Sequence, residues 1–289
     1  MTTSLTDKDW SSLISAIKSQ RCTPFLGAGI NAGILPLGRD IATRWATQYD
    51  YPLLDSDNLI RVAQFLAVEH YPMFPKDEIV RLLGDIASSS RLSGEDEPHR
   101  LLASLPLPIY LTTNYDNLMT VALQGKFRDP KREVCRWNTL LRDEATRFDS
   151  GYEPNPANPL VFHLHGYLEL PASIVLTEDD YFDFLVNISR EPLLLPKRVQ
   201  KALTETSVLF IGYGLADWNF RVLLQGLSRF MEKGLGRRHI AVMTAPDIKD
   251  SESRQAKVQA YLSAYYEKID VQVFWGTARE FCSELSKRL

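Results

Sequence analysis

Short apolar runs alternate with longer amphipathic segments along most of this chain. Apolar runs bounded by polar or turn-forming residues predict buried strands, and apolar positions at helical spacing predict the helices between them. The expected strands are residues 22–26, 108–112, 160–164, 173–176, 207–211, 239–244 and 271–274. Because strands and helices alternate, the pattern predicts an α/β fold, a doubly wound parallel sheet with right-handed crossovers.

Helices are expected in the stretches between these strands. The first begins near Asp7, where Thr6 and Asp9 have a spacing close to that of a capping box. The others are expected at residues 59–70, 77–87, 98–105, 116–123, 193–203, 217–232, 251–266 and 278–289.

Two long stretches depart from the regular alternation. Residues 40–105 contain little strand signal, and we expect much of this stretch to form a helical subdomain inserted between the first two strands. Residues 127–159 are polar and rich in Arg, Asp, Asn and Pro, which predicts a long excursion with little packing of its own.

Four short polar or glycine-rich segments follow predicted strands. Because the carboxyl ends of parallel strands meet at one edge of a sheet, these segments should lie together, where doubly wound proteins bind nucleotides. The segments are Gly27-Ala28-Gly29-Ile30-Asn31, Thr112-Thr113-Asn114-Tyr115-Asp116, His163-Leu164-His165-Gly166 and Phe210-Ile211-Gly212-Tyr213-Gly214.

The first segment, with Ala32, satisfies the G-x-G-x-x-G/A pattern of a phosphate-binding turn. Gly27 permits a tight turn, and Gly29 lets the backbone approach a pyrophosphate without a Cβ in the way. Glycine turns after strands are common, so the motif alone decides little. The acidic residue that dehydrogenases carry about 20 positions later has no convincing counterpart, which weighs against hydride transfer.

The second segment has two interpretations. It could only start a helix, with Thr113 or Asn114 as the N-cap and Asp116 favourably placed in the helix dipole. Alternatively, the Asn114 amide holds a ribose hydroxyl or an attacking water.

The third and fourth segments also carry both a structural and a functional interpretation. Strand alternation would put His163 and His165 on one face, and Gly166 would leave the strand end open. The reference pKa of histidine, near 6.5, suits a general base at neutral pH. We expect His165 to be that base and His163 its supporting neighbour. The fourth segment could be no more than a turn capped by Asp217.

Together and in this order, the four segments resemble the sirtuin NAD-binding domain. They are most similar to the bacterial sirtuin-like proteins that hydrolyse NAD in anti-phage defence. The resemblance extends from about Ser11 to the C-terminus, which implies one Rossmann-like NAD-binding catalytic domain over residues 1–289.

The resemblance also implies roles for individual residues. The glycine turn, here Gly27, Ala28, Gly29 and Asn31, would bind the NAD phosphates, although relatives usually carry Ser in the position of Asn31. In the second segment, Thr113 would contact NAD, Asn114 would be required for cleavage, and Asp116 would help to orient nicotinamide. In the fourth segment, Gly212 and Tyr213 would contact the adenosine half.

The chain departs from protein-deacetylating sirtuins in two places. The three cysteines, Cys22, Cys135 and Cys282, form no C-x-x-C pair, so there is no zinc ribbon and we expect no metal. Residues 34–40 lack the deacetylase sequence Pro-Asp-Phe-Arg. Both departures favour water over acyl-lysine as the acceptor.

The resemblance therefore implies an NAD+ hydrolase, an enzyme that releases ADP-ribose and nicotinamide, with NAD+ as substrate. A cyclic ADP-ribose product would form if a purine nitrogen attacked in place of water. Two alternatives stay open, an NAD-dependent protein deacylase or ADP-ribosyltransferase, and a non-catalytic NAD-sensing module.

Composition limits the partners and the setting. A formal charge of -3 without a Lys/Arg run argues against direct nucleic-acid binding. No apolar stretch has the length of a membrane span, the N-terminus is not a secretory signal, and the cysteine usage fits a reducing cytoplasm. The family implies control by homo-oligomerisation, by a HerA-like ATPase or by a fused sensor region.

Overall fold

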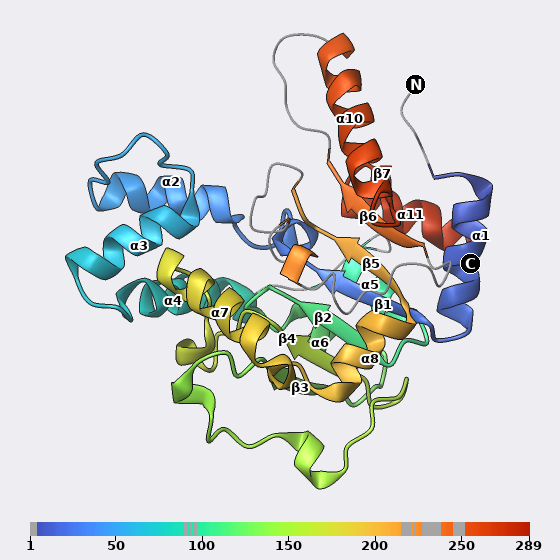
Figure 1. The fold of residues 1–289 in the computed structure, drawn as a ribbon, viewed down its shortest axis with the longest axis horizontal. Coiled ribbons are helices and arrows are strands. Elements are labelled where there is room, and N and C mark those ends of the chain that lie inside the picture. Colours follow the sequence, from blue (N-terminus) through green and yellow to red (C-terminus); the bar gives the residue numbers. More distant parts are fainter. Residues whose placement is uncertain are drawn as a thin grey trace.

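A parallel sheet forms the centre of the computed structural model (Figure 1). The structure describes residues 5–89, 97–214, 238–244 and 252–289, together with residues 92, 94, 221 and 224–226. Its seven strands lie in the order β3-β4-β2-β1-β5-β6-β7, and every neighbouring pair is parallel. They are β1 (Cys22–Leu26), β2 (Ile109–Thr112), β3 (Lys131–Val134), β4 (Leu160–His163), β5 (Ser207–Ile211), β6 (His239–Met243) and β7 (Val271–Trp275). The predicted α/β fold is confirmed.

The strand order reverses beside β1. From this strand the chain builds outward through β2 and β4, and it then returns to the opposite side of β1 with β5. The crevice outside the carboxyl ends of β1 and β5 is therefore the topological switch point, the place where open α/β sheets bind ligands.

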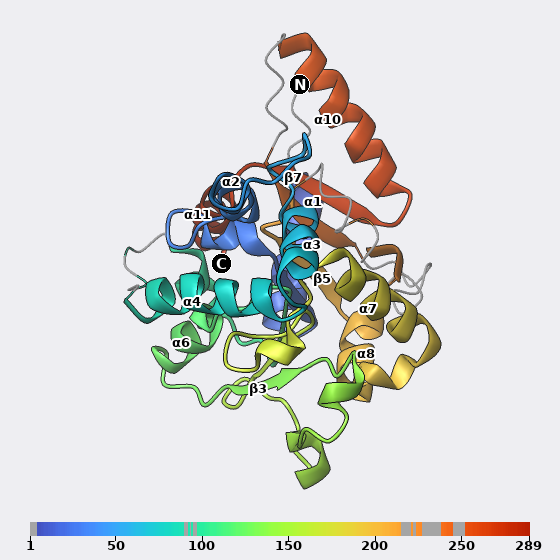
Figure 2. The ribbon, with the colours of Figure 1, turned by 90° about the vertical axis from the view of Figure 1, so that its left-hand side faces the viewer.

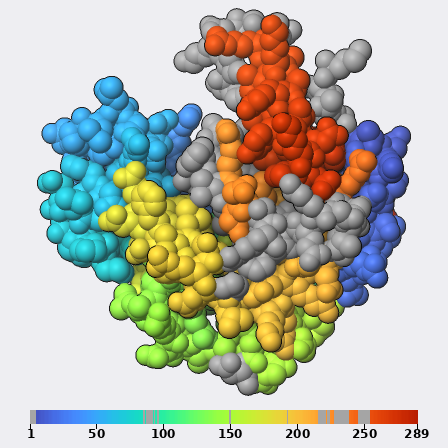
Figure 3. All heavy atoms as spheres, viewed as in Figure 1, coloured from blue at the N-terminus to red at the C-terminus, as the bar shows by residue number. Residues whose placement is uncertain are grey.

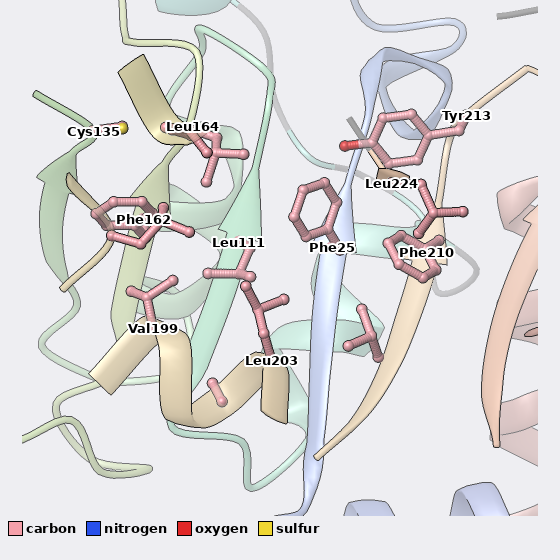
Figure 4. Close-up of a cluster of buried hydrophobic side chains, with 14 of the residues drawn as sticks. Phe25, Leu111, Cys135, Phe162, Leu164, Val199, Leu203, Phe210, Tyr213 and Leu224 are labelled. Atoms are coloured by element: carbon pink, nitrogen blue, oxygen red, sulfur yellow. The ribbon is translucent and has the colours of Figure 1, made fainter. Parts of the chain in front are cut away.

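Helices cover both faces of the sheet, which makes it doubly wound. On one face, an apolar cluster joins the strands to α1 (Asp7–Lys18), α5 (Pro98–Ser104), α6 (Leu118–Gln124) and α11 (Ala278–Arg288). On the other, a second cluster joins them to α7 (Glu178–Arg190), α8 (Lys197–Glu205) and α10 (Glu252–Glu267). Figure 4 shows part of this second cluster, in which Val199 and Leu203 of α8 face Phe162, Leu111 and Phe25 of the strands.

Three helices between β1 and β2 form a separate layer, here called the helical insertion. These are α2 (Gly38–Gln48), α3 (Leu59–Glu69) and α4 (Phe74–Ser89), which share a third apolar cluster around Trp45 and Leu66. Figures 1 and 2 show them grouped at one side of the sheet, whereas α5 packs against α6. In Figure 3, α7 (yellow) lies against the insertion (cyan).

Local sequence signals explain where several helices begin and end. The predicted capping box is present, because the Thr6 hydroxyl accepts from Asp9 N and the Asp9 carboxylate accepts from Thr6 N. The predicted helix over residues 193–203 is split at Pro196 into a short turn, Pro192–Leu194, and α8. The helix expected over residues 217–232 lies largely outside the described residues.

The sheet differs from the sequence-based expectation in two places, one strand predicted wrongly and one strand missed. The strand expected at residues 173–176 does not form. Ser173 ends a short turn, Val175 packs with the sheet cluster, and Ile174 and Leu176 pack with the insertion. Their side chains alternate between the two clusters, because this extended connecting segment is buried on both sides. Conversely, β3 was not expected, because an edge strand of sequence Lys-Arg-Glu-Val has no apolar run.

The polar excursion over residues 127–159 packs better than its composition suggests. It contains β3 as well as Cys135, Trp137 and Leu141, which are all buried in the sheet cluster. The Trp137 indole donates to the carbonyl of Ser173, 2.7 Å away. Phe148 and Tyr152 of the same stretch pack against this cluster as well, so scattered apolar side chains anchor a stretch that is polar on average.

No described helix combines the length and the apolar character needed to cross a membrane. Within the same residues, no three His, Cys, Asp or Glu side chains are grouped as a metal ion would need.

Candidate active site

A cleft of about 1010 Å³ opens at the switch point, between the carboxyl edge of the sheet and the helical insertion. Turns after β1, β2 and β5 line one side of it, and the starts of α2 and α3 line the other. Nine of the ten predicted site residues line this cleft, namely Ala28, Gly29, Asn31, Thr113, Asn114, Asp116, His165, Gly212 and Tyr213. The tenth, Gly27, is not part of the lining but contacts Tyr213 and Gly212.

The glycine turns after β1 and β5 interlock. Gly29 N donates to Gly212 O at 2.8 Å, and Gly27 N donates to Ile211 O at 2.8 Å. Gly212 has φ +89°, and a Cβ there would lie 2.5 Å from both Gly27 O and Ile30 N. A Cβ on Gly29 would lie 2.9 Å from Gly212 O. Close approach of two backbones thus requires glycine at these positions, whether or not a phosphate binds.

Tyr213 forms part of the cleft floor. Its side chain is buried, with 7% exposed, and in Figure 4 it lies beside Phe25. The Tyr213 hydroxyl donates to Leu26 O at 3.1 Å and lies 2.9 Å from the Thr113 hydroxyl. These contacts tie the end of β5 to the ends of β1 and β2.

Asn114 is fixed by three hydrogen bonds from three directions. Its backbone N donates to the Thr112 hydroxyl at 2.9 Å, and its Nδ2 donates to Gly27 O at 3.2 Å. Its carbonyl lies 3.0 Å from Nδ1 of His163. The helix that follows has Asn117 as its N-cap, so the interpretation of Thr113 or Asn114 as the cap is wrong.

Asp116 and Asn31 form a buried pair within the cleft. Asn31 Nδ2 donates to Asp116 Oδ2 at 2.6 Å, and Leu118 N donates to Asp116 Oδ1 at 2.9 Å. Asp116 therefore binds the first residue of α6 and also faces the cleft. Asn31 connects it to the glycine turn after β1.

The two histidines contact different groups. Strand β4 ends at His163, so strand alternation does not continue to His165. The His165 ring lies edge-on to Tyr181 and Phe184 of α7, with centroids 5.2 and 4.8 Å apart. His163 instead contacts the Asn114 carbonyl, not His165.

Burial keeps both rings neutral. Desolvation lowers the pKa of His165 to about 3, and it also lowers the pKa of His163. In each ring Nε2 is buried without a hydrogen-bond partner among the described residues. At neutral pH His165 can thus accept a hydrogen bond, but before substrate binds it holds a proton less readily than its reference pKa suggests.

Sequence reasoning missed the wall of the cleft that α7 and the insertion supply. Tyr181 and Leu185 of α7 line it, as do Ile41 and Arg61 of the insertion. Arg61 closes the wall by pairing with Asp55 at 2.7 Å and with Glu178 at 3.4 Å. The sequence signal for this wall was the amphipathic pattern of α7, which follows His165 closely in the chain. That pattern predicts a helix with one buried face, but it does not predict that the helix covers the cleft.

The burial of the two histidines predicts that stability falls below pH 6.5. Unfolded, both rings bind a proton near their reference pKa of about 6.5, whereas folded they stay neutral. Below that pH the unfolded state binds more protons, so the free energy of unfolding decreases by up to about 1.4 kcal/mol per pH unit for each ring. For His165 the decrease continues towards pH 3.

Urea unfolding between about pH 5 and pH 8 measures this dependence. The His165→Gln variant should show a shallower acid loss than the wild type. Identical slopes for the wild type and His165→Gln would contradict the prediction.

The fold and the cleft define this protein as a doubly wound α/β protein with its candidate site at the switch point of the sheet. Residues 108–268 match the family model described as SIR2-like domain, and the chain belongs to this family. The resemblance expected from the four segments is thereby confirmed at the level of the family.

Curated relatives named NAD(+) hydrolase ThsA match as well. The protein from Bacillus cereus (strain MSX-D12) is 30% identical over 167 residues, which cover 57% of this chain and 30% of the relative. That from Enterococcus faecium is 30% identical over 149 residues, covering 51% and 28%. That from Acinetobacter baumannii (strain 532279) is 22% identical over 292 residues, covering 96% and 55%. The chain thus spans from about a quarter to about half of these relatives' lengths.

Proposed function

We propose that this chain hydrolyses NAD+ to ADP-ribose and nicotinamide. The observation that carries the proposal is that Asn114 and His165 line one cleft at the switch point of a SIR2-like fold. The curated relatives named NAD(+) hydrolase support the same reaction.

The chemistry needs little acid catalysis. The bond between ribose C1′ and nicotinamide breaks with its electron pair passing to the pyridinium nitrogen, so the leaving group departs neutral. The oxygen of water forms the new bond to C1′, and one water proton is released. The barrier lies in the developing oxocarbenium charge and in delivery of the water, and positioning can lower it by several kcal/mol.

The residues divide these tasks. Asn114 would hold the ribose and the water. Neutral His165 would accept a proton from the water or from a ribose hydroxyl, and such general-base catalysis increases the rate by about 10²–10⁴-fold. Asp116 would orient nicotinamide through the pocket that it shares with Asn31. The β1 turn would hold the phosphates, and the Gly212-Tyr213 turn the adenosine half.

We further propose that the activity is a regulated, NAD-depleting effector function in bacterial anti-phage defence, carried out in the cytoplasm. An unrestrained NAD hydrolase would kill its own cell, so control must come from a homo-oligomer, a HerA-like ATPase or a fused sensor region. The curated relatives extend well beyond the matched region, which leaves room for such a region in them.

Chromatography of NAD+ incubated with the purified chain tests the proposal. We expect ADP-ribose and nicotinamide in equal amounts, and their loss in Asn114→Ala and His165→Ala. Cyclic ADP-ribose would mean that a purine nitrogen attacks instead of water. Binding of NAD+ without turnover, also in lysate of infected cells, would contradict the hydrolase and favour a sensing module.

A further inference from the structure

His163 is a buried polar residue that the proposed reaction leaves without a role. Its side chain is fully buried, and its Nδ1 lies 3.0 Å from the carbonyl oxygen of Asn114. A carbonyl oxygen can only accept, so Nδ1 carries the proton and Nε2 is the unprotonated nitrogen of the neutral ring. Strand alternation predicted that this histidine would support His165, but its hydrogen bond goes to Asn114.

The bonds to Asn114 leave one of its polar atoms open. The backbone N is held by Thr112, the carbonyl by His163 and Nδ2 by Gly27. Of the four polar atoms of Asn114, Oδ1 is the one without a hydrogen-bond partner among the described residues. It does not belong to the fully buried unpaired atoms. Because Gly27 O accepts from Nδ2, the amide orientation is fixed, and Oδ1 is the acceptor that Asn114 offers in the cleft.

We propose that His163 is a positioning residue that acts through Asn114, and that Asn114 in turn works as a hydrogen-bond acceptor through Oδ1. This inference rests on the proposed function, since the acceptor would receive the proton of the attacking water or of a ribose hydroxyl. The hydrogen bond from β4 fixes the Asn114 peptide from the side opposite Gly27. Without the hydrogen bond from His163, Asn114 keeps only its bonds to Thr112 and Gly27, and Oδ1 loses its defined position.

Two matched substitutions separate the Nδ1 contact from general packing. The amide nitrogen of an asparagine lies near the place of histidine Nδ1, whereas that of a glutamine lies near Nε2. We expect His163→Asn to stay within a few fold of the wild-type kcat. We expect His163→Gln and His163→Leu to lower kcat by about 10–10²-fold with little change in KM, because misplacement of a catalytic group affects the chemical step.

A double-mutant cycle shows which residue His163 acts through. In an Asn114→Ala background, we expect His163→Leu to cause no further loss of kcat, because the group that it positions is gone. The same further loss in that background as in the wild type would overturn the inference. So would a His163→Gln variant that is more active than His163→Asn.

Failure of the proposed function would be visible separately. A wild type that binds but never cleaves NAD+ contradicts the hydrolase, and the positioning contact is then tested by the protonation of the His163 ring. Nitrogen NMR of the histidine rings, with His163→Asn for assignment, tests the hydrogen bond without any substrate. A proton on Nδ1 of His163 supports the inference, and a proton on Nε2 overturns it.

Discussion

Replacing Asn114 with alanine should lower kcat for NAD+ hydrolysis by about 10²–10³-fold and leave the products unchanged. The substitution removes the open acceptor Oδ1 together with the Nδ2 donor that binds Gly27 O at 3.2 Å. Binding of ADP-ribose, which lacks the bond that breaks, should weaken much less. Release of labelled nicotinamide under single-turnover conditions measures the chemical step directly.

Asn138→Ala is the matched control. Asn138 is half-buried like Asn114 and donates from Nδ2 to the carbonyl of Ala172 at 2.9 Å, but it does not line the cleft. Both variants lose one amide-to-carbonyl hydrogen bond, worth about 1 kcal/mol of stability. Equal activities of the two variants would show that Asn114 is only structural.

Replacing Gly212 with alanine should cost about 2–6 kcal/mol of folding free energy and abolish turnover. The positive φ of +89° is strained for any residue with a Cβ, which accounts for about 1–3 kcal/mol. The new Cβ would also lie 2.5 Å from two backbone atoms of the β1 turn. Overpacking of this kind costs about 1–3 kcal/mol more. To relieve the contact, the two turns must separate, and the cleft floor separates with them.

Gly151→Ala isolates the first of these two contributions. Gly151 has φ +78° at the end of a short turn, and a Cβ there would meet nothing within 4 Å. This control should lose only about 1–2 kcal/mol and keep full activity. Urea unfolding monitored by fluorescence compares the two variants, and an equal loss of stability in both would contradict the interlock of the turns.

The sequence predicts those parts of the fold in which apolar burial dominates. The runs that form β1 and β5 are buried along nearly their whole length, so their positions could be read directly. Strand β3 could not, because an edge strand pairs with only one neighbour and tolerates Lys131 and Arg132. Residues 174–176 show the opposite error, since an alternating pattern reports burial and not hydrogen bonding to a sheet.

The candidate site was predictable as a set of segments but not as a geometry. Segments that follow strands must meet at one edge of a parallel sheet, which is why nearly all of the predicted residues line the cleft. The role proposed for His163 depends on the contact between its ring at the end of β4 and the Asn114 carbonyl after β2, which the sequence does not reveal. The lowered pKa of His165 depends on Tyr181 and Phe184, whose position only the folded chain defines.

The interlocked turns have a consequence for synthesis of the protein. Leu26 and Tyr213, which meet in the cleft floor, are 187 residues apart in the chain. Contacts between such distant residues form slowly, because a long loop must close before they are made. A ribosome that has not yet produced β5 therefore holds a nascent chain with only part of its cleft floor. Under the proposed function, unfinished chains cannot consume the NAD+ of the cell that is making them.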